Sequence, residues 1–120
     1  MISVVNINEK LSLFDDHWKP RIVGDVNDCQ VKLAKFKGPF TWHSHEHEDE
    51  MFLVIKGTLT IKLRERDLTI EEGELCIIPR GVEHMPLAPE EVHVLLVEPK
   101  STLNTGNVIS DKTVDKLERI

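Results

Sequence analysis

Short β-prone runs separated by glycine and proline are the feature that most constrains the fold of this chain. Residues 58–63 alternate polar and apolar side chains, as a strand with one solvated face does. Between Pro20 and Pro99 no stretch has the sustained three-and-four apolar spacing of an amphipathic helix. The pattern predicts strands at 21–27, 29–37, 40–45, 50–56, 58–65, 67–71, 74–79, 84–87 and 91–98. Short strands at this spacing are typical of an all-β sandwich or barrel.

The two ends of the chain differ from the middle. Residues 8–14 predict a short helix with Asn8 as N-cap, and residues 110–119 predict a terminal helix with Ser110 as N-cap. By contrast, residues 51–55 are apolar at every position. A strand of that kind is covered on both faces, and for a small domain this predicts a homodimer that covers the outer face.

Composition narrows the classes of partner. The chain carries 15 Lys and Arg against 21 Asp and Glu, a formal net charge of -6, which argues against nucleic acid as a partner. The longest apolar run, 51–55, is far too short to span a membrane. The first residues lack the basic and apolar regions of a signal peptide, and two cysteines are too few for a disulfide scaffold. We therefore expect a cytoplasmic protein.

Three of the six histidines fall within five residues, in an acidic segment. His43 and His45 are two residues apart, so on a strand both side chains face the same way and can chelate one divalent ion. Glu50 begins the next predicted strand and is a natural third ligand. His84 follows a Pro-x-Gly turn and is a candidate fourth ligand. His47 lies inside the acidic turn, where we expect a solvated side chain.

The spacing of these residues resembles the two motifs of the cupin superfamily. This chain departs from these motifs in two places. It has one residue fewer between Gly38 and His43, and it has Ala88 where the second motif has Asn. The first motif matches Gly38, His43, His45, Glu50 and Gly57, and the second matches Gly73, Pro79, Gly81 and His84.

The resemblance implies an all-β, double-stranded β-helix, a jelly-roll-like cupin barrel, here with short terminal helices. The resemblance covers roughly residues 30–98. Because 120 residues make one domain's worth of chain, we expect one cupin domain over residues 1–120, with an N-terminal lead at 1–20, the barrel at 21–99 and a C-terminal tail at 100–120. The metal ligands would be His43, His45, Glu50 and His84. Three imidazoles and one carboxylate suit Mn, Fe, Co, Ni, Cu or Zn and do not suit Ca or Mg.

Two classes of function remain open at this point. In the first, the protein is a metal-dependent enzyme that acts on a small polar molecule, such as a dioxygenase or a sugar-phosphate isomerase of the mannose-6-phosphate-isomerase type. Catalytic candidates are His93 and Glu83 as bases, with Arg80, Lys56 and Arg64 as cations for a phosphate group. In the second, the protein is a non-catalytic module that binds or senses a metabolite or metal. Fold resemblance alone does not decide between them.

Overall fold

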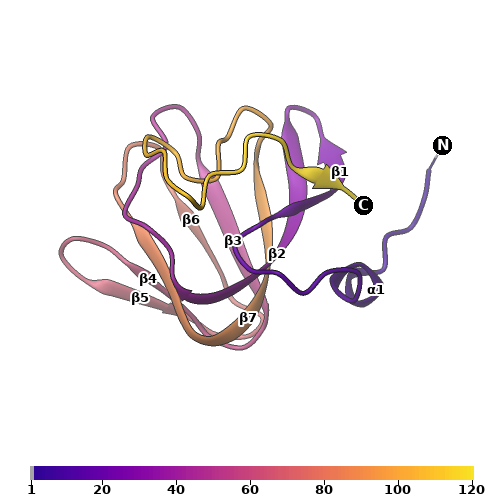
Figure 1. Cartoon of the computed structure of the whole chain (residues 1–120), viewed down its shortest axis with the longest axis horizontal. Helices are drawn as coiled ribbons and strands as arrows, with labels where there is room; N and C mark the ends of the chain where they lie inside the picture. Colours follow the sequence, from indigo (N-terminus) through magenta and orange to yellow (C-terminus); the bar gives the residue numbers. More distant parts are fainter. Residues whose placement is uncertain (1) are drawn as a thin grey trace.

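The computed structural model describes residues 2–120 and is almost entirely β, with one short helix (Figure 1). This confirms the predicted fold class. Among the described residues, no helix is long and apolar enough to cross a membrane. The elements are α1 (Ile7–Leu11), β1 (Arg21–Val26), β2 (Cys29–Pro39), β3 (Glu50–Lys56), β4 (Leu59–Lys62), β5 (Asp67–Ile70), β6 (Leu75–Ile78), β7 (Met85–Pro99) and β8 (Glu118–Arg119).

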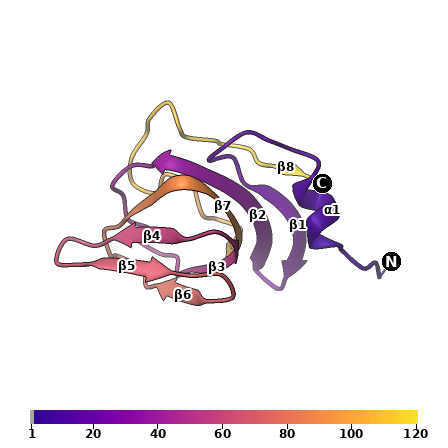
Figure 2. The same cartoon turned by 90° about the horizontal axis from the view of Figure 1, so that it is seen from below.

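Two long antiparallel strands, β2 and β7, organise the molecule. The first part of β7 pairs with β4, and its second part pairs with β3, so one strand contributes to two layers. The path β5-β4-β7-β2-β1-β8 does not close on itself, and β3 and β6 branch from β7. In Figure 2 the hairpin of β4 and β5 lies at one side of the molecule and β1 with β2 at the other. The result is an open, two-layered jelly-roll sheet.

Alternation along the strands places the core between the layers. In β7, Val92, Val94 and Leu96 are buried while the residues between them are half-buried, because successive side chains of a strand point to opposite faces. In β3, Phe52 and Val54 point inward in the same way. The outer face is partly covered by α1 and the segment after it, where Leu11 and Phe14 pack on Leu33.

The strand β7 is continuous where the sequence predicts two strands, 84–87 and 91–98. The register with β2 shifts between the pairs Phe36↔Val92 and Gly38↔Ala88, so β7 bulges and bends around Pro89 instead of ending there. A proline without an N–H is tolerated at such a bulge. The strand expected at 40–45 is also absent, and only an isolated bridge joins His43 to His84.

The helix predictions need correction at both ends of the chain. The first helix begins after Asn6, whose Oδ1 accepts a hydrogen bond from the N–H of Glu9 at 2.9 Å, so Asn8 is not the cap. Residues 110–119 are not helical, and they end in the short strand β8 beside β1. Asn104 accepts from the N–H of Val114 and donates to the carbonyl of Lys112. These side-chain bonds occupy backbone groups that a helix would need.

Candidate metal centre

Backbone pairing places the two histidine segments side by side. The N–H of His43 donates to the carbonyl of His84 at 3.1 Å, and the N–H of His84 donates to the carbonyl of His43 at 2.9 Å. The N–H of Gly81 donates to the carbonyl of His45 at 2.8 Å, which ties the Pro-x-Gly turn to the same segment. Glu50 is the first residue of β3 and points inward. His43 and His84, which are 41 positions apart in the chain, therefore meet at one end of the sheet.

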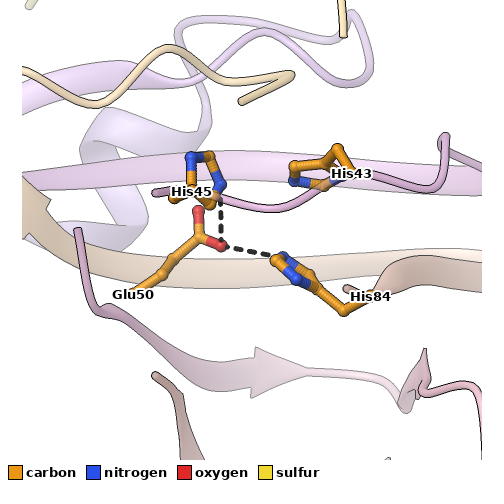
Figure 3. Close-up of side chains that lie close together, drawn as sticks. All are labelled: His43, His45, Glu50 and His84. Atoms are coloured by element: carbon orange, nitrogen blue, oxygen red, sulfur yellow. Dashed lines mark hydrogen bonds and ion pairs between the residues drawn. The ribbon is translucent and has the colours of Figure 1, made fainter. Parts of the chain in front are cut away.

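The four predicted ligand side chains converge in this place (Figure 3). One ligand atom from each of His43, His45, Glu50 and His84 lies within 4.8 Å of the others, and all four residues are buried. Glu50 Oε1 lies 3.2 Å from His84 Nε2 and 3.5 Å from His45 Nε2. The structure thus brings together the set that the spacing singles out.

Hydrogen bonds orient two of the rings. His43 donates from Nδ1 to the carbonyl of Thr41, and His84 donates from Nδ1 to the carbonyl of Val82, both at 2.9 Å. These donations leave Nε2 of each ring with a free lone pair, the form that binds a metal. The ring of His45 is buried, and neither of its nitrogens has a hydrogen-bond partner. Buried polar atoms are rarely left without a partner, so the orphaned His45 nitrogens fit a missing cation.

The protonation states also suit a metal. Burial, followed by the neighbouring His84, lowers the pKa of His43 to about 4, so the ring is neutral at pH 7. Burial by itself would raise the pKa of Glu50, but the nearby rings of His45 and His84 outweigh it and hold that pKa well below its ordinary value. Metal ligands must be deprotonated, and a carboxylate beside three imidazoles is the donor set of a transition metal. The four residues can therefore hold a metal ion.

A narrow cavity begins at this centre. His43 and Glu50 line one end of it, and its volume of about 30 Å³ is room for about two water molecules. The rest of the wall is mainly apolar and aromatic: Trp18, Pro20, Phe36, Phe40, Phe52, Pro86 and Leu96.

Trp18 forms the centre of the aromatic wall. Its ring stacks on Phe36 with centroids 4.3 Å apart and on Phe40 with centroids 4.7 Å apart, and Phe40 packs edge-on against His43. Its backbone has φ of 64°, a left-handed conformation that is costly for a bulky residue. Hydrogen bonds to the carbonyls of Lys35 and Lys37 hold it there. The sequence carries no signal for this residue, since it lies in the N-terminal lead.

A second buried polar pair, Lys32 and Glu98, lies beside the metal centre and is also missed by sequence reasoning. Lys32 Nζ donates to Glu98 Oε1 at 2.7 Å, and both side chains are almost fully buried. Burial, with the adjacent Glu50 carboxylate, raises the pKa of Glu98 well above its ordinary value. Glu98 lines the cavity, and its Oε2 has no hydrogen-bond partner. This oxygen is a polar group available to a ligand.

The C-terminal segment covers the centre. Asn104 lines the cavity, and Asn107 and Ser44 exchange two hydrogen bonds, at 2.9 and 3.0 Å. Gly106 has φ of 55°, and a Cβ there would overlap the carbonyl oxygen of Ser44 and approach His43. Only glycine fits this close approach.

The other candidate residues lie away from the cavity. His93 is on the outer face of β7, with Nε2 3.2 Å from Glu91 Oε2. Glu83 is exposed and paired with Arg64, whose guanidinium stacks over Trp42. Arg80 pairs with Asp49 on the surface. The remaining two, Lys56 and His47, are exposed.

The comparison with known families decides the identity of the fold. The cupin domain family matches residues 31–98, which is more than half of the chain. This chain belongs to the cupin family. A cupin-2 domain containing protein from Shewanella frigidimarina has a similar crystal structure, with 47% identity and a TM-score of 0.80 over 81% of this chain and 95% of that one.

Curated relatives are longer than the matched region of this cupin. The uncharacterized protein YdbB of Bacillus subtilis is 35% identical over 52% of this chain and 56% of its own length. The 3-hydroxyanthranilate 3,4-dioxygenase of Ruegeria pomeroyi is 32% identical over 61% of this chain and 44% of its own length. The chain thus spans about half the length of these relatives. They are similar to this protein in the cupin domain.

Proposed function

We propose that this cupin is a metal-dependent dioxygenase for a small molecule with a flat, largely apolar body and one polar group. The observation that carries the proposal is the cavity, which joins the His43, His45, Glu50 and His84 donor set to an aromatic wall. Similarity to the 3-hydroxyanthranilate dioxygenase of Ruegeria pomeroyi supports the same class. Because a dioxygenase places both oxygen atoms in its product, the reaction needs no external reductant.

Each part of the site has a role in this proposal. The metal, when bound, supplies Lewis acidity and redox chemistry that side chains lack. Trp18 and Phe40, which stack on each other, belong to the aromatic wall of the cavity, and a flat apolar ring packs against that wall. Glu98 Oε2 accepts a hydrogen bond from a hydroxyl or amino group of the substrate. Asn104 and the segment around it exclude water once the substrate is in place.

A sugar-phosphate isomerase is less well supported by the geometry. The cationic candidates for a phosphate, Arg80, Lys56 and Arg64, do not line the cavity. The base candidates Glu83 and His93 do not line it either. An apolar wall also gives a sugar few hydrogen-bond partners.

Oxygen uptake tests the proposal. Metal-free protein is reloaded separately with Fe, Mn, Co, Ni, Cu and Zn and supplied with aminophenols, catechols and, for comparison, sugar phosphates. We expect oxygen consumption with one redox-active metal and an aromatic substrate, and none with Glu50→Gln. Sugar-phosphate isomerisation without oxygen use would refute the proposal. Tight binding of the aromatic compounds with no turnover on any metal would favour the non-catalytic binding module.

A further inference from the structure

Trp18 lies between the metal cavity and a second hollow on the surface. The second hollow, which we call the groove, has a volume of about 520 Å³. Its lining combines residues 17–19 of the N-terminal lead with residues 111–116 of the C-terminal segment. Among the described residues, Trp18 alone lines both the cavity and the groove. Residues 17–19 therefore belong to the wall that separates them.

This wall is joined to the sheet by Trp18 itself. The pairing of β1 with β2 ends at Leu33, so β1 does not cover the last part of β2. Trp18 bonds there instead: its backbone N–H donates to the carbonyl of Lys35 and its indole Nε1 donates to the carbonyl of Lys37, both at 2.9 Å. Pro20 follows and has no N–H with which to continue a ladder. The wall is therefore a loop segment tied to β2 by two bonds of one residue.

The backbone of Trp18 is strained in this position. Its φ of 64° lies in the left-handed region, which is costly for a bulky side chain. Residues in such conformations persist only when their surroundings hold them there, and they cluster at ligand clamps and switch regions. If the two bonds to β2 were broken, φ would return to negative values and the ring would leave the cavity wall. The strain thus favours an open position of Trp18, and the surrounding contacts favour the closed one.

A carboxylate on β7 holds the residue that precedes Trp18. Glu91 Oε1 accepts a hydrogen bond from Nε2 of His17 at 2.7 Å, and Oε2 of the same carboxylate lies 3.2 Å from Nε2 of His93. The side chains of His17 and Glu91 are 33% and 43% exposed. An exposed pair of this kind contributes little to the stability of the whole fold. It can therefore set the position of the wall without being needed for folding.

We propose that residues 17–19 form a gate between the groove and the cavity. Trp18 is the moving side chain, and Glu91 is a positioning residue that holds the gate closed through His17. In the open position, Trp18 leaves its two bonds to β2 and a ligand passes from the groove to the metal centre. The proposal rests on the cavity as the ligand site of the proposed function, and it is independent of the reaction carried out there.

Hydrogen exchange measured by NMR tests the gate without a ligand or a metal. The chain has two tryptophans, so Trp42→Phe leaves Trp18 with the single indole N–H signal. In that protein, the backbone and indole N–H groups of Trp18 should exchange about tenfold or more faster than the amide of buried Val94, because local opening costs less than global unfolding. They should also exchange faster than the N–H of Asn107, which is bonded within the C-terminal cover.

Glu91→Ala tests the positioning role. Loss of the exposed pair should raise the open fraction, and with it both Trp18 exchange rates, about threefold, while the exchange of Val94 stays unchanged. Glu90→Ala is the matched control, since Glu90 is exposed beside Glu91 and its replacement makes the same change in charge. Removal of zinc from loaded protein by pyridine-2,6-dicarboxylate, a flat chelator, should accelerate by the same factor. The equilibrium affinity for zinc should stay constant, because a gate affects entry and exit equally.

Four results would contradict the gate or one of its parts. Exchange of the Trp18 protons at the rate of Val94 would show that the wall opens only on unfolding, which would overturn the proposal. Faster exchange at Asn107 than at Trp18 would assign the entrance to the C-terminal segment and would also overturn it. Equal exchange in Glu91→Ala and Glu90→Ala would refute the role of Glu91. Faster exchange at Trp18 with an unchanged rate of zinc removal would refute the entrance.

Discussion

Two polar clusters, the metal centre and the Lys32 and Glu98 pair, are buried side by side in this molecule. Their buried polar groups are compensated in different ways. The metal centre combines three imidazoles with the Glu50 carboxylate and leaves His45 without a hydrogen-bond partner. The Lys32 and Glu98 pair holds its own countercharge at 2.7 Å. The first cluster is therefore incomplete without a cation, whereas the second is held by its own partners apart from one free oxygen on Glu98. The difference indicates which cluster can hold a metal and which helps to shape the cavity.

Removing a ligand from the first cluster should have the largest effect. We predict that Ala at His43, His45, Glu50 or His84 gives nearly metal-free protein when wild type is fully loaded. The loss should exceed the roughly 10–100-fold caused by removing a residue that only orients a ligand. Elemental analysis of untagged protein measures it. His47→Ala and His93→Ala are the controls and should stay loaded, and a result in which His47→Ala loses metal while His84→Ala keeps it would contradict the assignment.

Breaking the second cluster should cost stability and leave metal loading in place. Lys32→Met should lower the free energy of unfolding by about 3 kcal/mol, the lower end for a broken buried ion pair. The lower end applies because the raised pKa of Glu98 lets its carboxyl take up a proton when Lys32 is gone. Urea unfolding measures the change. The control Lys62→Met removes an exposed pair with Asp67 and should change stability by less than about 1 kcal/mol.

The covering segment can be loosened without replacing a residue of either cluster. Gly106→Ala introduces a Cβ against Ser44 at a left-handed backbone position and should cost about 2 kcal/mol locally. Hydrogen exchange should then rise at residues 101–114, with little change in β2 and β7. Gly24→Ala has open space around its Cβ and should leave exchange unchanged. Equal effects from the two variants would contradict the role of Gly106.

In metal-free protein, His43 and Glu98 should make the free energy of unfolding depend on pH with opposite signs. The pKa of His43 is lowered from 6.5 to about 4, so its stabilising contribution is complete above pH 6.5 and is lost on acidification towards pH 4. The pKa of Glu98 is raised, so the folded state binds its proton more tightly and gains stability on acidification towards its unfolded pKa. Urea unfolding at several pH values, in the presence of a chelator, measures this. Compared with wild type, His43→Gln should lose less unfolding free energy on acidification, and Glu98→Gln should lose more. If the unfolding free energies of both variants changed with pH by the same slope, the predicted opposite signs would be contradicted.

Sequence reasoning reached the metal cluster because three of its residues lie close together in the chain and the spacing of all four resembles the two cupin motifs. His43 and His45 are separated by one residue, Glu50 starts the next strand, and the turn from Pro79 to Gly81 ends just before His84. The same reasoning missed the helix start at Asn6 and predicted a helix where Asn104 ties down the C-terminal segment. The observed cap of the first helix, Asn6, lies two residues before the predicted one, Asn8. The error at the C-terminal segment arises from the hydrogen bond between Asn104 and Val114, which are ten residues apart.

The sequence by itself determined the all-β class, the alternation of the strands and the donors His43, His45 and Glu50, because these follow from periods of two and from short spacings, while the resemblance to the cupin motifs added His84. Only the tertiary structure decided that Trp18 enters the cavity, that Lys32 meets Glu98 and that β6 keeps an open edge. Those outcomes depend on which distant segments pack together: Lys32 and Glu98 are 66 positions apart, and they meet because β2 and β7 pair in register. Pairing between distant strands is set by the burial of the whole core, which no local pattern encodes.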